Sequence, residues 1–202
     1  QVASLVAGAS EPTWHARAAT LEFSAWFAFK HAFLLSGHET AALRGNVVGA
    51  LADARLEVRE AASRTLAGML RGAGAQASAE LRARFLAAAG EERARRSREK
   101  RAGAPAPAPG EEELVRRHGT VLGLAACVLS CPYDCPEWMP EAVVGLCSLA
   151  AEPAPICDTV RKTFADFKRS HQDTWSATRE AFTEDQWGLI SEGLHLAPTY
   201  FA

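Results

Sequence analysis

Three cysteines spaced four residues apart, with a histidine upstream, are the first residues in this chain that could do chemistry. They are Cys127, Cys131 and Cys135, and the histidine is His118. Thiolate and imidazole are ligands of zinc and iron–sulfur sites, but such sites commonly contain CxxC pairs and none is present here. On a helix, Cys127 and Cys131 would share one face and act as small hydrophobic residues. We therefore expect no metal site and no cofactor.

Ser170 and His171 place a hydroxyl group next to an imidazole, which raises the question of nucleophilic catalysis. Such catalysis needs a base against the hydroxyl and a third group that orients the base. The sequence contains no GxSxG elbow, no HExxH motif and no glycine-rich phosphate loop. The sequence therefore predicts a binding protein and not an enzyme.

A basic run near the middle of the chain could recognise a partner through its charge. Its basic residues are Arg93, Arg95, Arg96, Arg98, Lys100 and Arg101. Glu91, Glu92 and Glu99 dilute the run, and an alternating Ala-Pro segment follows it. Two interpretations stay open, a nuclear-import signal on a mobile loop or a solvated segment without a partner, and a phosphate-rich partner is a weaker third. Residues 93–110 are expected to form a flexible insertion.

The last seven residues, LAPTYFA, combine a proline with two aromatic residues. Pro198 lacks a backbone donor and restricts the residue before it, so 199–202 are expected to leave the last helix as a short extended tail. An aromatic tail of this kind suits insertion into a pocket on another protein.

The composition is that of an ordinary globular chain, with 202 residues, 48% hydrophobic and 23% charged. The net charge of −2 selects neither nucleic acid nor a membrane surface. The start QVASLV has no Met and no basic segment, and no run of about 18 uncharged apolar residues occurs, so we expect a soluble fragment of something longer. The five cysteines fit reduced intracellular thiols better than a disulfide framework.

The elements that must position these residues follow from a recurring pattern. An arginine within an apolar helical stretch returns at Arg17, Arg59, Arg116 and Arg161. The intervals are 42, 57 and 45 residues, against a period of about 40–47 for HEAT and armadillo repeats. The excess in the middle interval falls at the insertion. The sequence thus predicts an all-α, HEAT/armadillo-like solenoid of antiparallel helix pairs, with acid-to-arginine pairs between adjacent repeats setting the register.

The expected helices lie at about 2–9, 13–35, 39–51, 54–71, 77–92, 111–130, 137–151, 156–170, 173–182 and 184–194. The second is apolar nearly all round and is expected to lie between two layers of neighbours. Thr183 and Gln186 are expected to form a capping box at the start of the last helix. Trp138 is expected to anchor the proline-rich loop CPYDCPEWMP.

Six segments, in their order along the chain, resemble one family. They are WHARAATLEF, LEVREAASRTLAGML, LVRRHGTVLGLAACVLSCPYD, PEWMPE, VRKTFADFKRSHQDTW and the end YFA. They are similar to the C-terminal region of the large, single-chain, HEAT-repeat proteasome activators of the subunit 4 family. The resemblance covers nearly the whole chain and weakens only over residues 72–110. It implies an ATP-independent cap that contacts the ring of α-subunits of the proteasome core particle and opens its gate.

The resemblance also implies a docking motif of a hydrophobic residue, then tyrosine, then any residue, at the carboxyl end. Tyr200 takes the hydrophobic place, Phe201 stands where tyrosine is expected, and Ala202 gives the terminal carboxylate. A pocket between two α-subunits would receive the tail, and a lysine there would bind the carboxylate. Without the phenol hydroxyl, docking is expected to survive while gating weakens.

The family further implies a bromodomain-like stretch that binds acetylated lysine on histones. Such a site needs an amide donor, usually asparagine, and aromatic walls. Asn46 is the only asparagine, and the family's Asn-Phe pair aligns near Ala73 and Gly74, where both residue types are replaced. Whether another donor substitutes or the pocket is lost stays open.

The predicted domain organisation has four parts. HEAT-like repeats with the bromodomain-like region span 1–92, the insertion spans 93–110, further HEAT-like repeats span 111–198, and the docking tail spans 199–202. The expected partners are the core-particle α-subunits and acetylated core histones, without direct nucleic-acid or membrane binding, in the nucleus and cytoplasm. The alternatives are a histone reader as the main role, or a generic HEAT-repeat interaction scaffold.

Overall fold

The computed structural model describes residues 2–8, 10–102 and 110–195 of the 202-residue chain. These residues form ten α-helices and one 3-10 turn, without a strand. Their bounds are α1 Val2–Gly8, α2 Trp14–Lys30, α3 Gly37–Ala50, α4 Leu56–Arg71, α5 Ala75–Ala102, α6 Glu111–Leu129, α7 Met139–Cys147, α8 Ile156–Ser170, η1 Gln172–Thr174, α9 Trp175–Glu180 and α10 Glu184–His195. The predicted all-α class is confirmed. None of the described helices is both long and apolar enough to traverse a membrane.

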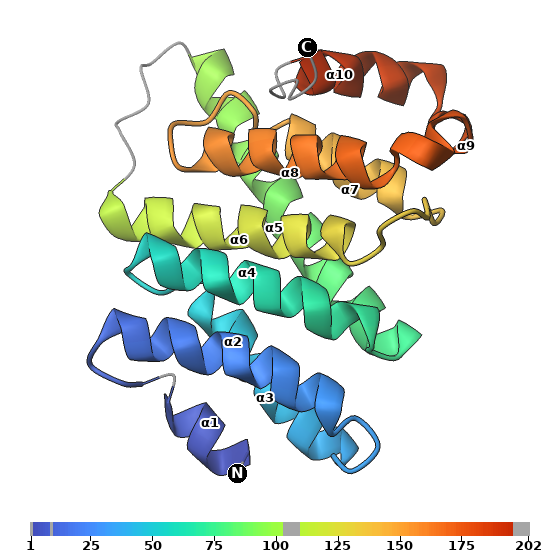
Figure 1. The fold of residues 1–202 in the computed structure, drawn as a ribbon. Coiled ribbons are helices and arrows are strands. Elements are labelled where there is room, and N and C mark those ends of the chain that lie inside the picture. The colour runs from blue at the N-terminus through green and yellow to red at the C-terminus, as the bar shows by residue number, and fades with distance from the viewer. Residues whose placement is uncertain (1, 9, 103–109, 196–202) are drawn as a thin grey trace.

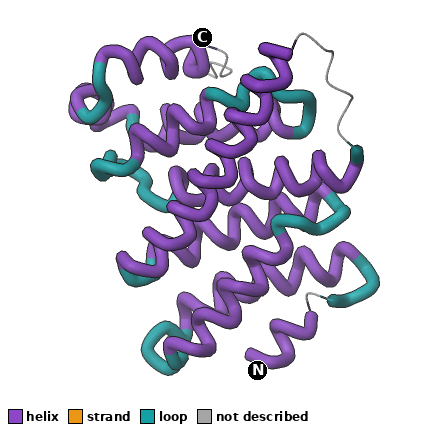
Figure 2. Tube along the Cα trace, turned by 180° about the vertical axis from the view of Figure 1, so that it is seen from behind, coloured by secondary structure: helices purple, strands orange, loops and turns teal. Residues whose placement is uncertain are grey.

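The helices stack in two layers, as a solenoid does. Helices α2, α4, α6 and α8 lie side by side in one layer, each packed on the next (Figure 1). Helices α3, α5 and α7 lie behind them, and α5 crosses the back of the stack obliquely (Figures 1 and 2). Helix α10 packs against α7 and α8 at the carboxyl end. The predicted α-solenoid of paired helices is confirmed.

The core is centred on α4 and α6, which have neighbours on both sides of the stack. In α4, Val58, Ala62 and Leu66 recur at helical spacing and are fully buried. Helix α1, at the amino end, has no buried residue. Burial therefore increases from the amino end of the stack towards its middle.

Helix α6 approaches its neighbours most closely at two glycines. A Cβ atom at Gly119 would lie 2.5 Å from the carbonyl oxygen of Leu51, and one at Gly123 would lie 2.3 Å from the ring of Phe85. These positions require a residue without a side chain, because no real Cβ atom tolerates such contacts. The two glycines thus set how tightly α6 packs on the preceding repeat.

The start of the last helix follows its sequence signal. The backbone N–H of Gln186 donates to Thr183 Oγ1 at 3.2 Å, and the backbone N–H of Thr183 donates to Gln186 Oε1 at 3.0 Å. The predicted capping box is confirmed. Ser36 and Glu39 form a second capping box, at the start of α3, which was not predicted although the Ser-x-x-Glu pattern is its usual sequence signal.

Helix α5 is longer than predicted. The predicted helix ends at residue 92 and a flexible insertion is predicted over 93–110, but the helix continues through Ala102. Glu92 and Glu99 pair with Arg95 at three- and four-residue spacing, and no proline or glycine interrupts residues 91–102. Such pairs support a helix, so the run is helical. The Ala-Pro segment at 103–109 lies outside the described residues.

The expectation that the second helix is covered on two sides is wrong. Phe23 is 49% exposed, Trp26 54% and Phe29 85%, although Leu21 and Phe27 are buried. The helix also ends at Lys30, so Phe33 and Leu34, which are exposed as well, belong to the following turn. Helix α4 packs on one side of α2, but the short α1 is the only described helix on the other side.

Candidate functional site

Two arginines tie neighbouring repeats together in the same way. Arg17 donates from Nε and Nη2 to the Asp53 carboxylate at 2.8 and 2.9 Å, and from Nη1 to the carbonyl oxygens of Glu11 and Pro12. Asp53 lies in the turn before α4, so this ion pair links two repeats. The predicted acid-to-arginine pair between adjacent repeats is confirmed here. Bidentate binding fixes the direction of approach as well as the distance.

Arg59 repeats this arrangement one repeat further along. Its Nη1 donates to the carbonyl oxygens of Asp53 and Ala54 at 2.7 and 2.9 Å. Its Nε donates to His118 Nδ1 at 3.1 Å, in the place where Arg17 meets a carboxylate. Both arginines thus close the turn before their own helix and reach the next repeat.

His118 is fully buried between three helices of the front layer. Because Nδ1 accepts from Arg59, the neutral ring carries its proton on Nε2, which lies 2.8 Å from Thr159 Oγ1 on α8. Burial, and then the positive charge of Arg59, lower the pKa of His118 to about 4. The ring therefore serves as a neutral hydrogen-bonding bridge from α4 to α8.

These contacts show which residues occupy matching positions in successive repeats. The first two are the predicted arginines, and the last two are not. The laterally matched positions are Arg17, Arg59, His118 and Thr159, at intervals of 42, 59 and 41 residues. Arg116 binds Glu113 on its own helix, and Arg161 faces Asp158 at the surface. The recurring arginine does not mark the register there, because a histidine and a threonine occupy the positions that contact the neighbouring repeat.

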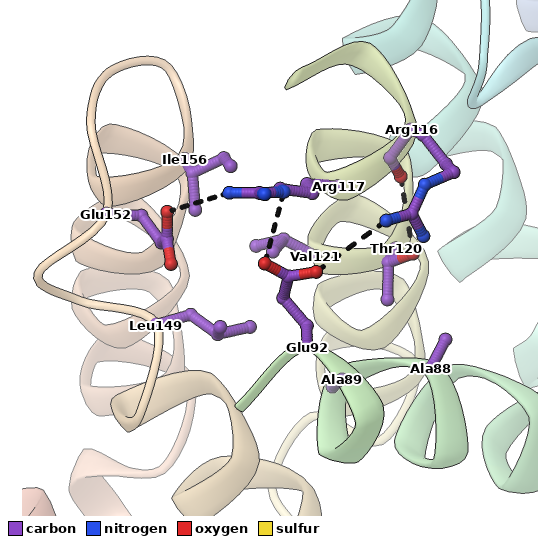
Figure 3. Close-up of a pocket in the computed structure, with 10 residues that line it drawn as sticks. All are labelled: Ala88, Ala89, Glu92, Arg116, Arg117, Thr120, Val121, Leu149, Glu152 and Ile156. Carbon is purple, nitrogen blue, oxygen red and sulfur yellow. Dashed lines mark hydrogen bonds and ion pairs between the residues drawn. The ribbon is translucent and has the colours of Figure 1, made fainter. Parts of the chain in front are cut away.

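A cluster of buried charges joins α5, α6 and the α7–α8 turn (Figure 3). Arg117 Nε lies 3.1 Å from Glu92 and 2.8 Å from Glu113, and its Nη1 lies 3.9 Å from Glu152. Arg116 Nη2 lies 3.6 Å from Glu92. Glu92, Arg117 and Glu152 are each exposed by 9% or less. Hydrogen bonds from Arg116 and Arg117 lower the pKa of Glu113 to about 2.

The space between these charged side chains is too small for a ligand. The volume open to a water-sized molecule is about 10 Å³, which is about what one water molecule needs. From the sequence, Glu92 is expected only to dilute the positive charge of the basic run. The three- and four-residue spacings of Glu92 to Arg95 and of Glu113 to Arg116 and Arg117 were the signal available for this cluster. It is a structural connection between repeats.

The cysteines do not assemble with His118. The described part of the chain holds no group of three or more His, Cys, Asp or Glu side chains placed to bind a metal ion. Burial raises the pKa of Cys127 to about 12 and that of Cys135 to about 11, so both thiols stay protonated near neutral pH. Cys127 packs in the hydrophobic core, as the helical spacing predicted.

Ser170 and His171 hold the end of α8 to the loop after α6. The ring nitrogens of His171 lie 2.9 Å from the carbonyl oxygen of Phe167 and 3.1 Å from that of Asp134. The Ser170 hydroxyl lies 3.0 Å from His171 Nδ1 and 3.1 Å from the carbonyl oxygen of Phe167, so the structure brings the serine and the histidine together. In a catalytic serine–histidine pair, the ring nitrogen that does not face the hydroxyl binds an acidic side chain that orients the ring. In His171 that nitrogen, Nε2, faces the backbone carbonyl of Asp134. The same loop carries Trp138, whose ring lies 4.3 Å below the guanidinium group of Arg82.

Aromatic packing fixes the last described helix. Trp175 and Phe182 contact the ring of Trp187 edge-on, with centroids 5.6 and 5.9 Å apart. The Arg179 guanidinium group lies 5.5 Å from the same ring. Helix α10 is thus held at its first turn, and the chain continues from its other end to the predicted docking residues Tyr200, Phe201 and Ala202. Those three residues lie outside the described part of the chain.

The residues considered for acetyl-lysine binding do not come together. Asn46 lies on α3, and its buried Nδ2 has no hydrogen-bond partner among the described residues. Ala73 and Gly74 lie in the turn between α4 and α5, where a Cβ atom at Gly74 would meet no atom within 4 Å. A groove beside α2 has aromatic walls formed by Phe23, Trp26 and Phe27, but neither Asn46 nor this turn lines it. Among the described residues, an amide donor and aromatic walls therefore do not meet at this turn.

The basic run is displayed on α5. Arg93, Arg98 and Arg101 are exposed, whereas Arg95 pairs with Glu92 and Glu99. The side chains of Arg96 and Lys100 lie outside the described residues. One prediction for this run is a nuclear-import signal on a mobile loop. In the structure the run is part of a helix and not of a loop.

Fold and site together define a helical-repeat protein whose buried polar groups connect repeats. The family described as proteasome activator complex subunit 4-like, C-terminal, matches residues 114–202. Proteasome activator subunit 4 of Arabidopsis thaliana is 36% identical over 198 residues, which cover 98% of this chain and 10% of that protein. Proteasome activator complex subunit 4 of Homo sapiens is 36% identical over 200 residues, which cover 96% and 10%.

A more distant relative matches a shorter segment. Proteasome activator BLM10 of Saccharomyces cerevisiae is 31% identical over 74 residues, or 36% of this chain. The chain therefore belongs to the proteasome activator complex subunit 4 family. It spans about a tenth of the length of the curated relatives that it matches along nearly all its residues.

Proposed function

We propose that this chain is the carboxyl-terminal part of an ATP-independent proteasome activator, and that Tyr200, Phe201 and Ala202 dock the protein on the α-ring of the core particle. The observation that carries this proposal is the match of the family to residues 114–202, which includes those three residues. The identity of 36% along nearly the whole chain supports the same assignment.

The proposed docking chemistry divides between the side chains and the carboxylate. The rings of Tyr200 and Phe201 enter a pocket between two α-subunits and bury apolar surface there. The Ala202 carboxylate accepts charge-assisted hydrogen bonds from a lysine of the pocket. Helix α10, from which the chain continues to these residues, is held at its first turn by the ring of Trp187.

Phe201 affects gate opening more than attachment. A pocket group that bonds a tyrosine hydroxyl is left unpaired by phenylalanine, at a cost of about 1–3 kcal/mol. The apolar burial of the ring is retained. We therefore expect Phe201→Tyr in the full-length activator to increase hydrolysis of a fluorogenic peptide by core particle.

The test compares four full-length proteins: the natural sequence, Phe201→Tyr, a form that lacks residues 200–202, and a form with one glycine added after Ala202. The added glycine keeps the aromatic side chains and displaces the carboxylate. Capture of core particle and peptide hydrolysis are measured together. The proposal requires both to fall for the deletion and for the added glycine. Unchanged capture by both altered ends would contradict it.

Recognition of acetylated histones is a second candidate, taken from the resemblance alone. The described residues provide no asparagine at the turn where the family pair aligns. Titration of an acetylated histone peptide into the full-length protein, with the unmodified peptide as control, tests it. Binding that requires the acetyl group would give the protein a reader role beside docking, and equal binding of both peptides would remove that role.

A further inference from the structure

A small groove lies between α5, α7 and the start of α10. Leu86 and Gly90 of α5 and Val144 and Gly145 of α7 give it an apolar lining, and Gln186 of α10 also lines it. Its volume is about 180 Å³. Sites for small molecules generally have volumes of about 300–1,000 Å³. The groove therefore has room for a few side chains of a protein segment and not for a whole cofactor.

The groove is open on the side of Gly90. A Cβ atom at Gly90 would meet no atom within 4 Å. Gly145 on α7 differs, because a Cβ atom there would lie 3.4 Å from Leu124 and 3.7 Å from Leu86, in ordinary contact. The two helices thus already pack together at Gly145. A larger side chain at Gly90 is expected to fill the groove without displacing either helix.

Helices α5 and α7 run in the same direction along the groove. The guanidinium group of Arg82 on α5 lies 4.3 Å from the ring of Trp138, just before α7. Further along both helices, Leu86 approaches Gly145. One end of the groove therefore lies at the start of α7, and the other lies where α5 continues towards its basic residues.

The two ends of the groove carry opposite charges. Glu141, in the first turn of α7, lines one end, and Arg93 of α5 lines the other. Beyond Arg93, Ser97 and Arg101 follow at four-residue spacing, so they continue along the same side of the helix. Arg93, Arg98 and Arg101, here called the basic stripe, are exposed, and none of them pairs with a carboxylate of another described residue.

We propose that the groove and the basic stripe together bind an acidic, amphipathic segment of a partner protein. Apolar side chains of the segment enter the groove over Leu86 and Val144. Its carboxylates pair with Arg93 and Arg101, which lie about 12 Å apart along α5. An amphipathic helix laid into an apolar groove is a common mode of peptide recognition, and guanidinium groups bind carboxylates with two parallel hydrogen bonds.

Two observations favour an acidic protein segment over a nucleic-acid strand. The apolar lining of the groove offers nothing to a phosphate group, whereas it buries apolar side chains. Glu141 at the other end would repel a phosphate chain, which would have to continue past it. The proposal does not depend on docking of the tail, because neither the groove nor the basic stripe includes residues 196–202.

Selection of random peptides displayed on phage, with the full-length protein as the target, tests the proposal. We expect the enriched peptides to combine apolar residues with several Asp or Glu residues. The affinity of the same peptides, made synthetically and labelled with a fluorophore, is then measured by fluorescence anisotropy. Enrichment of no peptide, or of basic peptides, would overturn the proposal.

Two variants of the full-length protein locate the bound peptides. Gly90→Leu fills the groove and Arg93→Glu reverses the charge at its end, and each is expected to weaken binding at least tenfold. The matched controls are Gly68→Leu, at an exposed glycine of α4 with no atom within 4 Å, and Arg84→Glu, at an exposed position of α5. Both controls are expected to keep the affinity. Equal effects of variants and controls would contradict the inference, and Arg93→Glu with its control still decides if Gly90→Leu does not fold.

Two further results would replace the proposed partner with another. Binding of a single-stranded oligonucleotide that Arg93→Glu abolishes and Gly90→Leu leaves unchanged, without selection of acidic peptides, would identify a phosphate-binding helix. A dimer of the full-length protein that dissociates on Gly90→Leu, measured by analytical ultracentrifugation, would show that a second copy occupies the groove. Either result would overturn the proposal.

Discussion

At the scale of single residues, His118 has a structural role that could not be predicted from its residue type. An imidazole near three cysteines suggests a metal ligand, but the ring instead accepts from Arg59 and bonds Thr159. The neutral form is the useful one, because a second proton would occupy Nδ1 and face the Arg59 guanidinium group. Burial and that positive charge both oppose protonation.

The stability of the chain is expected to fall in acid through His118. Its pKa is about 4 in the folded chain, below the ordinary value of 6.5. The stabilisation is complete above pH 6.5 and decreases as the pH falls towards 4, because the unfolded chain binds a proton that the folded chain does not. The loss amounts to roughly 3 kcal/mol. Urea unfolding at several pH values measures it.

Two histidine variants test whether His118 causes this loss of stability. His118→Gln removes the titrating group and is expected to flatten the pH dependence between pH 6.5 and 4. His38→Gln, at an exposed position on α3, is expected to keep it. Equal slopes for the two variants would show that His118 does not carry the acid sensitivity.

At the scale of helices, sequence reasoning succeeded where local signals mark an element. Thr183 with Gln186 predicted the capping box at the start of α10, and the structure has it. Such signals act within a few residues, so a single sequence contains them. The exposed face of α2 could not be predicted in this way, because its apolar pattern is the same whether a neighbour covers Phe23 or not.

The length of α5 was missed for a related reason. A run of basic residues beside an Ala-Pro segment resembles a linker. The prediction of a flexible insertion used this charge composition and gave no weight to the helix propensity of the same residues. What keeps the helix intact is the pairing of Arg95 with Glu92 and Glu99, together with contacts from Glu92 to α6. The contact between Glu92 and Arg117 of α6 joins residues far apart in sequence, so a local pattern does not reveal it.

The close approach of α6 predicts opposite effects for two glycine substitutions. Gly119→Ala is expected to lower the free energy of unfolding by about 1–3 kcal/mol, because the new methyl group meets the Leu51 backbone, which cannot yield. Gly68→Ala, on the exposed side of α4 with no atom within 4 Å, is expected to raise it by up to about 1 kcal/mol. Urea unfolding measures both. The same sign for the two changes would disprove this account of the packing.

The buried charge cluster predicts a strong dependence on Glu92. Glu92→Gln removes the negative charge between Arg116 and Arg117 and is expected to destabilise the chain by roughly 3 kcal/mol, because a buried guanidinium group loses a carboxylate partner. Glu91→Gln changes the neighbouring exposed position and is expected to have an effect near zero. Thermal unfolding of both variants provides the comparison, and similar melting temperatures would refute the role of Glu92.

At the scale of the whole molecule, the array was predictable and its register was not. The period of about 40–47 residues identified the stacking of repeats, whereas the matched positions Arg17, Arg59, His118 and Thr159 became visible only from the contacts. Arginine, histidine and threonine can occupy the matching position of successive repeats, because each supplies a hydrogen bond to the neighbouring repeat. The docking residues 200–202 lie outside the described part, so that prediction depends on the resemblance and the family match.

Burial predicts how protection from hydrogen exchange varies along the chain of residues 1–202. Amides of α4 and α6, which have neighbours on both sides, are expected to exchange slowest. Amides of α1, which has no buried residue, are expected to exchange fastest among the described helices. Exchange followed by mass spectrometry tests this order. Slow exchange in α1 would mean that a 202-residue chain already closes its own amino-terminal end.

The 28 residues of α5 have a mechanical consequence. A solenoid bends like a spring when successive layers slide past one another. Helix α5 follows α4, packs on α6 and α7, and is fastened by Glu92 to Arg117, so sliding among these layers would strain a single rod of about 42 Å. We therefore expect the layers formed by α4, α5, α6 and α7 to slide past one another less readily than layers without such a connecting helix.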